Sequence, residues 1–230
     1  MKRFLIIALS CVLLFSLYSC AKTGIENSDE SIEQSDISSN EKTLTWAFYN
    51  SLDPSKMFIT FETVTELGTD ARFAQAISGE NVTTVIDYLD NSNINDIYEL
   101  YTPDTTYYLD VVGKKYSASN EAGQGNLFAN LDKSRYNNAD KVTTKDLDGV
   151  SYICEVFGNE TNATNYYFDT ETKAIYAVES VENGASKQIM RNIKVSSIIP
   201  ENVVLSIPSD YRATTLTINE PIEWPWGDLD

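Results

Sequence analysis

The stretch KVTTKDLDGVSYICEVF, residues 141–157, indicates the fold class most directly. Two runs rich in β-branched and aromatic residues flank Asp148-Gly149, and this dipeptide suits a type I′ turn because both central positions of that turn need a positive φ. The two runs are therefore expected to pair as an antiparallel hairpin. Asn183-Gly184 carries the same signal further along the chain, so we expect a second hairpin there.

Similar runs of Thr, Val, Ile, Tyr and Phe begin at Lys56 and continue towards the C-terminus. Turn residues separate them at Gly68-Thr-Asp70, Gly79-Glu80, Pro103-Asp104 and Gly113-Lys114. The last strand-like runs are Tyr166–Phe168, Ala174–Glu182 and Lys187–Ile199, followed by a closing segment, Ile199–Pro208. Short β-rich runs separated by turn residues predict an antiparallel meander.

Two segments interrupt this pattern, and the first is expected to be the main helix. Ser38–Glu41 matches an S-x-x-E capping box, which predicts a helix over Asn40–Leu52 that ends before Asp53-Pro54. The expected apolar stripe of this helix consists of Leu44, Phe48 and Leu52, with Trp46 facing different surroundings.

The second interruption is Ser117–Asp140, which is rich in Asn, Ala and Gly. Leu127, Phe128 and Leu131 have the spacing of one apolar helix face, so we expect a short helix that crosses over the sheet. Connections of this length often carry function, which makes the segment a candidate lid. An antiparallel sheet with two helices places the chain in the α+β class.

The N-terminus has the pattern of a bacterial lipoprotein signal. Two positive charges precede the uncharged apolar run Phe4–Tyr18, which is short for a membrane-spanning helix. Leu17–Cys20 then resembles a lipobox. In a lipobox the cysteine thiol receives a lipid, and the cysteine becomes the first residue of the chain after cleavage. The alternative is an ordinary signal peptide that is cut at another site, with Cys20 incidental.

These patterns divide the chain into four parts. Residues 1–19 are the expected signal peptide, and residues 20–42 are the acylated Cys20 with an acidic, Ser- and Asn-rich disordered tether. Residues 43–212 form the folded domain, and residues 213–230 form an acidic tail that contains Pro and Trp. We therefore expect a monomer that is lipid-anchored to the cell membrane, on its extracytoplasmic face.

Charge and composition exclude several function classes. The chain has 34 acidic and 17 basic residues, a net charge of −17, and no histidine. Such an acidic surface repels phosphate backbones, so nucleic acid is not an expected partner. The absence of histidine removes the usual general base and the commonest zinc ligand. We therefore expect no enzyme activity, no cofactor and no metal site.

The remaining candidates for catalysis have structural explanations. The carboxylate pairs Asp146/Asp148 and Asp169/Glu171 fall at expected hairpin turns, where Asp is favoured because its side chain bonds to nearby backbone. Cys154 lies in an apolar β-branched run without an adjacent basic residue to lower its pKa, so a buried, unreactive thiol is expected.

The order of these elements resembles the LolA-like and LppX-like bacterial lipoproteins. The resemblance is carried by LYTPDTTYYLDVVGKKYSAS (100–119), NYYFDTETKAIYAVES (165–180) and IPENVVLSIPSDY (199–211). It implies an antiparallel sheet curved into a half-barrel over one main helix and a short crossing helix. It also implies a role in binding or carrying a lipid or another hydrophobic ligand in the cell envelope.

The expected site is an apolar groove between the sheet and its helices. Its lining consists of Phe48, Ile59, Phe61, Ile86, Leu127, Phe128, Leu131, Tyr176 and Val178. Side chains two apart on a strand share a face, which groups Ile59 with Phe61 and Tyr176 with Val178. The same residues could instead fill a solid core, and the sequence leaves that alternative open.

Two other functions also stay open. The chain could be a surface interaction module that binds a protein or glycan through exposed Tyr and Trp side chains, without a ligand cavity. A hydrolase that uses carboxylates alone is the third hypothesis, and the turn positions of its candidate residues argue against it.

The lipobox gives the first testable prediction. Cells that express the parent chain with a labelled fatty acid should incorporate the label into the protein, and a Cys20→Ser variant should not. The acyl chains should hold the parent chain in the membrane fraction, since each buried CH₂ contributes about 0.8 kcal/mol. A parent chain that carries no label would contradict the lipobox interpretation.

Overall fold

The computed structural model describes residues 42–64, 70–89, 96–119 and 125–215. The expected signal peptide, Cys20, the tether up to residue 41 and the tail from residue 216 lie outside the described residues. Within the described part of the chain, no helix has both the length and the apolar character needed to cross a membrane.

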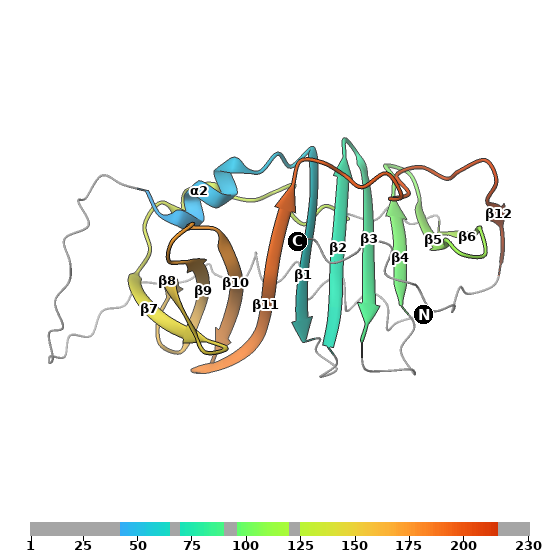
Figure 1. Cartoon of the computed structure of the whole chain (residues 1–230). Coiled ribbons are helices and arrows are strands. Elements are labelled where there is room, and N and C mark those ends of the chain that lie inside the picture. Colours follow the sequence, from blue (N-terminus) through green and yellow to red (C-terminus); the bar gives the residue numbers. More distant parts are fainter. Residues whose placement is uncertain (1–41, 65–69, 90–95, 120–124, 216–230) are drawn as a thin grey trace, which may run out of the picture.

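One large sheet dominates the molecule (Figure 1). Its strands are β1 (Lys56–Val64), β2 (Asp70–Ser78), β3 (Asn81–Tyr88), β4 (Ile97–Tyr101), β5 (Thr106–Asp110), β6 (Lys115–Ser119), β7 (Lys141–Leu147), β8 (Val150–Gly158), β9 (Asn162–Asp169), β10 (Ile175–Glu182), β11 (Ala185–Ser196) and β12 (Arg212–Ala213). The order across the sheet is β12-β6-β5-β4-β3-β2-β1-β11-β10-β9-β8-β7. All neighbours are antiparallel except β12, which runs parallel to β6.

The order shows two meanders, β1 to β6 and β7 to β11, that meet where β1 pairs with β11. We call this pairing the seam. The expected hairpin turns are confirmed: Asp148 and Gly149 have φ of 54° and 82°, and Asn183 and Gly184 have φ of 53° and 76°. The turns account for pairing inside each meander. The seam instead joins two strands that are more than 120 residues apart in the sequence, β1 and β11.

The sheet is curved and does not close on itself, which is consistent with the expected half-barrel. β7 and β12 form its two edges, and the meander that contains β7 to β10 curls strongly (Figure 1). Irregularities in register occur in β1–β11, in β9–β10 and in β10–β11. Bulges bend a strand and increase its twist, so they contribute to this curvature.

A strap covers part of one face of the sheet, which we call the strap face. After β11 the chain runs across the upper ends of β1 to β4 towards β12 (Figure 1). Val203 is buried there in a cluster with Phe58 and Leu100. The side chain of Asn81 donates a hydrogen bond to the Leu205 carbonyl, at 3.0 Å. The closing segment expected at Ile199–Pro208 therefore covers the sheet without forming a strand.

The opposite face, which we call the helix face, carries the main helix α2 (Leu44–Ser51). The helix starts at Leu44, so the expected start at Asn40 is wrong; the expected capping box lies outside the described residues. Thr43 is the N-cap, and its hydroxyl accepts a hydrogen bond from the Trp46 backbone N–H at 2.9 Å. This capping bond explains why the helix begins at Leu44.

The buried stripe of α2 also differs from the expected one. Thr45 and Tyr49 are buried, and Leu44, Phe48 and Leu52 are only half-buried. Trp46 is also partly covered, because it packs against the apolar cluster on the helix face that contains Tyr49 and Phe61. The Lys42 ammonium lies 3.9 Å from the centre of the Trp46 ring. The polar Thr45 can take a buried position because its hydroxyl and backbone N–H both bind a carboxylate.

That carboxylate belongs to Glu155 in the middle of β8, and it fixes α2 to the sheet. Glu155 is 4% exposed. It accepts hydrogen bonds from the backbone N–H groups of Leu44 and Thr45, both at 2.8 Å, and from the Thr45 hydroxyl at 2.7 Å. The first N–H groups of a helix lack partners inside the helix and carry partial positive charge, so a carboxylate there is stabilising.

The crossing segment contains a short helix, as expected, but the helix does not include the expected residues. Leu127 and Phe128 lie in a turn, and a 3-10 helix, η1 (Lys133–Tyr136), follows. The Asn126 side chain accepts a hydrogen bond from the Phe128 N–H at 2.8 Å, and Asp132 accepts one from the Ser134 N–H at 3.0 Å. Such local side-chain bonds compete with helix formation, which explains why apolar spacing alone gave the wrong prediction.

The Glu155 contact gives a stability prediction. Replacing Glu155 by Gln removes the charge and replaces one of the two acceptor oxygens by an NH₂ group, which cannot accept a hydrogen bond, so the free energy of unfolding should fall by about 2–3 kcal/mol. Urea denaturation at neutral pH measures the change. Glu160→Gln, at an exposed turn position, is the matched control and should stay within about 0.5 kcal/mol of the parent. Equal stability of the two variants would contradict this role of Glu155.

Candidate functional site

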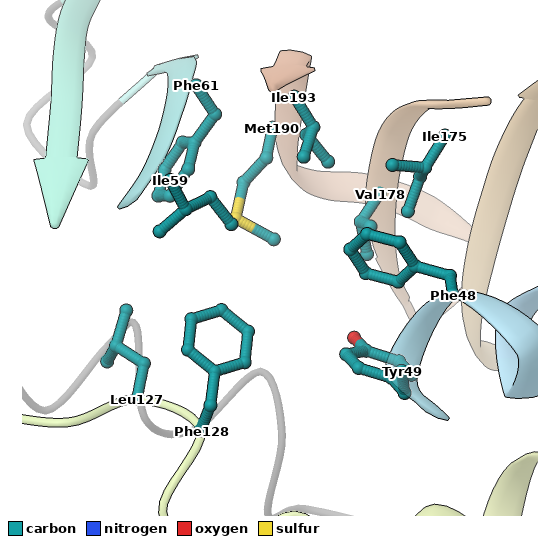
Figure 2. A pocket seen from close by; sticks show the side chains of 10 residues that line it. All are labelled: Phe48, Tyr49, Ile59, Phe61, Leu127, Phe128, Ile175, Val178, Met190 and Ile193. Atoms are coloured by element: carbon teal, nitrogen blue, oxygen red, sulfur yellow. The ribbon is translucent and has the colours of Figure 1, made fainter. Parts of the chain in front are cut away.

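An apolar cavity lies on the helix face, directly over the seam (Figure 2). The lining residues are Phe48 and Tyr49 of α2, Ile59 and Phe61 of β1, Leu127 and Phe128 of the crossing segment, Ile175 and Val178 of β10, and Met190 and Ile193 of β11. The cavity is therefore built from both meanders and from the elements that cover them.

The cavity is a partly open, narrow space. Its empty volume is about 410 Å³ when the open solvent at its mouth is included. Of the side chains that the structure describes, no charged one lines it. A wall of this composition would leave a polar or charged group without hydrogen-bond partners, which costs several kcal/mol, so the wall disfavours polar occupants.

Two bulges place side chains on the cavity wall. In β11 the extra residue is near Asn192, which has φ of 52° and donates a side-chain hydrogen bond to Glu62 at 2.8 Å. The bulge interrupts the alternation of faces, so Met190 and Ile193, three residues apart, both line the cavity. In β10 the register shifts between Ile175 and Ala177, and residues 175 and 178 are brought to the same wall in the same way.

The structure brings six of the nine expected groove residues together around the cavity: Phe48, Ile59, Phe61, Leu127, Phe128 and Val178. Ile86 is buried in the same cluster, and Leu131 packs partly against it, but neither lines the cavity. Contact of any of these side chains with a ligand stays a prediction.

Tyr176 lies on the strap face, so the expectation that it shares a face with Val178 is wrong. It belongs to the cluster of Tyr152, Cys154, Tyr167 and Ala177, and its ring stacks on that of Tyr152 with centroids 4.5 Å apart. The bulge at this position is the physical reason, because it adds one residue to the strand and reverses the expected alternation.

Sequence reasoning missed four lining residues: Tyr49, Ile175, Met190 and Ile193. Tyr49 could have been found from its i, i+4 spacing to Thr45, which shares its buried face of α2. The other three occupy positions next to bulges, and the sequence carries no clear sign of either bulge.

Tyr49, which lines the cavity, packs against two other buried tyrosines, Tyr136 and Tyr166. The hydroxyls of Tyr49 and Tyr166 lie 3.2 Å apart, and the Tyr166 hydroxyl donates to that of Tyr136 at the same distance. Burial, followed by the neighbouring tyrosines, raises the pKa values of Tyr49 and Tyr166 well above the usual value. The raised pKa values keep Tyr49 and Tyr166 protonated, and the Tyr166 hydroxyl lies within hydrogen-bond distance of the other two hydroxyls.

Of the carboxylates considered for catalysis, Asp148 and Glu171 lie in turns, as expected, whereas Asp146 and Asp169 lie at the ends of β7 and β9, next to those turns. Asp146 accepts a hydrogen bond from the Ser151 hydroxyl across the β7–β8 hairpin. Asp169 accepts from the backbone N–H groups of Glu171 and Thr172, and these bonds, with that from the Thr172 hydroxyl, lower its pKa. Among the described residues, no group of three or more Cys, Asp and Glu side chains is placed to hold a metal ion.

Comparison with known proteins gives matches to solved structures at low sequence identity. No family model matches the chain, and no curated protein matches it in sequence. An uncharacterized conserved protein from Thermus thermophilus is similar in structure, with 8% identity, coverage of 70% of this chain and 90% of that chain, and a TM-score of 0.38.

MucB is similar at the same level. Its structure matches with 10% identity over 72% of this chain and 62% of that chain, at a TM-score of 0.41. The MucA/MucB complex of Pseudomonas aeruginosa gives 10% identity, coverage of 75% and 63%, and a TM-score of 0.41. The chain thus spans less than two thirds of the MucB chains, and likeness this distant supports no conclusion about function.

Cys154 gives the prediction of this section. It is fully buried on the strap face, and burial raises its pKa to about 11. At pH 8 only about one thiol in a thousand is then ionised, and only the thiolate reacts. In a chain with Cys11 and Cys20 replaced by serine, alkylation by iodoacetamide should be about a hundredfold slower in the folded than in the urea-unfolded protein. Equal rates in the two states would show an accessible, reactive thiol.

Proposed function

We propose that this protein binds the hydrocarbon chain of a lipid or of another apolar molecule in the cavity over the seam. The observation that carries the proposal is a partly open cavity with an apolar wall, built where both meanders and their covering elements meet. In this proposal the domain is a LolA-like half-barrel, and the protein is a bacterial lipoprotein held through Cys20 on the extracytoplasmic face of the membrane.

The lining restricts which part of a ligand enters. A charged headgroup would find no partner inside, so it stays at the mouth in water, and only the hydrocarbon is buried. Each CH₂ transferred from water contributes about 0.8 kcal/mol, so affinity should rise with chain length until the cavity is full.

Because the cavity is narrow, binding requires its wall to widen. Two features of the lining support this step. Leu127 and Phe128 belong to a turn segment without strand pairing, and Met190 has a flexible side chain that adapts to irregular spaces. Movement of these groups leaves the paired strands of the sheet intact.

The proposed role is binding without catalysis. Among the described residues, the wall contains one titratable side chain, Tyr49, whose raised pKa keeps it protonated. A lipid-anchored binding protein also accounts for the order of parts expected from the sequence, with a lipidated N-terminus, an acidic tether and then a folded domain.

The second candidate is a module that binds a protein or glycan without using the cavity. It is favoured by the aromatic group on the strap face of β8 to β10, where Tyr152 and Tyr176 stack with an interplanar angle of 8°. The Glu179 carboxylate accepts hydrogen bonds there from Tyr167, at 2.5 Å, and from Asn165, at 2.8 Å. Tyr152, Tyr167 and Asn165 are buried, so Tyr176 and Glu179, which are half-buried, are the members of this group that would contact a partner.

Substitutions at two adjacent residues of β10, one on each face of the sheet, distinguish the two candidate functions by their effect on fatty-acid binding. Ile175→Trp places a larger side chain at the half-buried edge of the cavity and should weaken binding of a fluorescent fatty acid at least about tenfold, equivalent to about 1.4 kcal/mol. Tyr176→Phe, one residue away on the strap face, is the matched control and should bind within about twofold of the parent.

Native mass spectrometry of the purified parent protein shows directly whether an apolar molecule copurifies. Absence of fatty-acid binding by the parent protein would overturn the lipid proposal and leave the interaction module. Equal loss of binding in both variants would show that the cavity is not the site.

A further inference from the structure

Two anchors, one on each side of the seam, hold the elements over the cavity. We call α2 together with residues 125–136 the cover. At one end, the carboxylate of Glu155 in β8 binds the start of α2. At the other end, the amide of Gln75 in β2 binds the segment that contains Leu127. Figure 2 shows the cavity between Leu127 and Phe128 on one side and Ile59 and Phe61 on the other.

Gln75 is a polar residue in an apolar setting. It is 1% exposed and lies on the helix face of β2 between Phe73 and Ile77, which belong to the apolar cluster. Its Nε2 donates to the Gly125 carbonyl at 2.7 Å and to the Thr84 hydroxyl at 3.1 Å. Its Oε1 accepts from the Leu127 N–H at 3.3 Å. One side chain thus satisfies a backbone acceptor and a backbone donor of the cover.

The contact at Gly125 is close. A Cβ atom on Gly125 would clash with Cδ2 of Tyr101, so a larger residue could not approach the sheet to the same position. The half-buried Tyr101 packs against the apolar cluster, and its hydroxyl donates to Glu99. Without a Cβ, the Gly125 backbone can lie close to this ring, and in that position its carbonyl accepts from Gln75.

The two anchors differ in strength. Glu155 offers a carboxylate to three donors at 2.7–2.8 Å, and such charge-assisted bonds are roughly twice as strong as neutral ones. Gln75 makes two neutral bonds to the cover, one of them at 3.3 Å. A third contact at that end, from the Asn126 side chain to the Pro54 carbonyl at 2.9 Å, is exposed to water, which competes with it.

We propose that Gln75 is a positioning residue that holds Leu127 and Phe128 against β1, and that the cover opens at this end while Glu155 keeps the other end in place. Building on the proposed function, a hydrocarbon chain enters between Leu127–Phe128 and Ile59–Phe61 once Gly125 and Leu127 leave the Gln75 amide. Leaving exposes that amide to water, which supplies replacement hydrogen bonds and makes the opening reversible.

The first test needs no ligand. Amide hydrogen exchange on the full chain should be at least about tenfold faster at Leu127 in Gln75→Leu than in the parent, because the acceptor for this N–H is removed, and unchanged at Thr45. Thr83→Val is the matched control, since Thr83 donates to the Val204 carbonyl of the strap on the other face of the sheet. It should leave Leu127 exchange at the parent rate.

The second test measures uptake of cis-parinaric acid by stopped-flow fluorescence. Gln75→Leu should take up this fatty acid at least about fivefold faster than the parent, and Thr83→Val should match the parent. Thr84→Val, which removes only the hydroxyl that orients the Gln75 amide, should shift exchange and uptake in the same direction by a smaller factor. It replaces Gln75→Leu if that variant fails to fold.

The outcomes separate the two proposals. Binding by the parent with unchanged Leu127 exchange and unchanged uptake in the variants would overturn the role of Gln75 and leave the proposed function in place. Faster Leu127 exchange without binding of cis-parinaric acid by any form would overturn the entrance together with the proposed function. Faster exchange at Thr45 in Gln75→Leu would overturn the proposal that only one end opens.

Discussion

A single buried carboxylate fixes the main helix to the sheet. A charge in a protein interior is costly unless donors surround it, and Glu155 has two backbone N–H groups and one hydroxyl around its two oxygens. The arrangement satisfies both partners, because the same N–H groups have no acceptor within α2. It fixes the first residue of the helix and the strand that the helix rests on, and therefore the position of Tyr49 beside the cavity. The same position of α2 brings the Tyr49 hydroxyl within 3.2 Å of the Tyr166 hydroxyl. The N-cap at Thr43 lies at the same end of the helix as Glu155.

The sequence predicted the local part of the fold well. A hairpin turn is decided by two adjacent residues, so Asp148-Gly149 and Asn183-Gly184 were sufficient. The seam could not be predicted in this way, because Phe58 and Ser196 are distant in the sequence and their pairing has no turn to mark it. The start of α2 was misplaced for a related reason, since the carboxylate that stabilises Leu44 and Thr45 comes from a distant strand.

For the candidate site, residue type was more predictable than position. The sequence identified apolar side chains such as Phe61 and Phe128 that line the cavity, since apolar residues on strands and turns are usually covered. The alternation rule failed at Tyr176, where one extra residue turns the side chain to the other face. Gln75 offered no signal, because its partners are backbone groups of a segment whose path no local pattern reveals.

The seam has a consequence for folding kinetics. Contacts within each meander are local and close short loops, whereas pairing of β1 with β11 joins residues near both ends of the domain and carries a larger loop-closure entropy. We therefore expect the two meanders to form first and the seam to be the slow step. Until then β1 and β11 are free edges, able to pair with other chains during folding. Because the cavity takes its wall from both meanders, an intermediate with one meander lacks the cavity, which is complete only after the seam has formed.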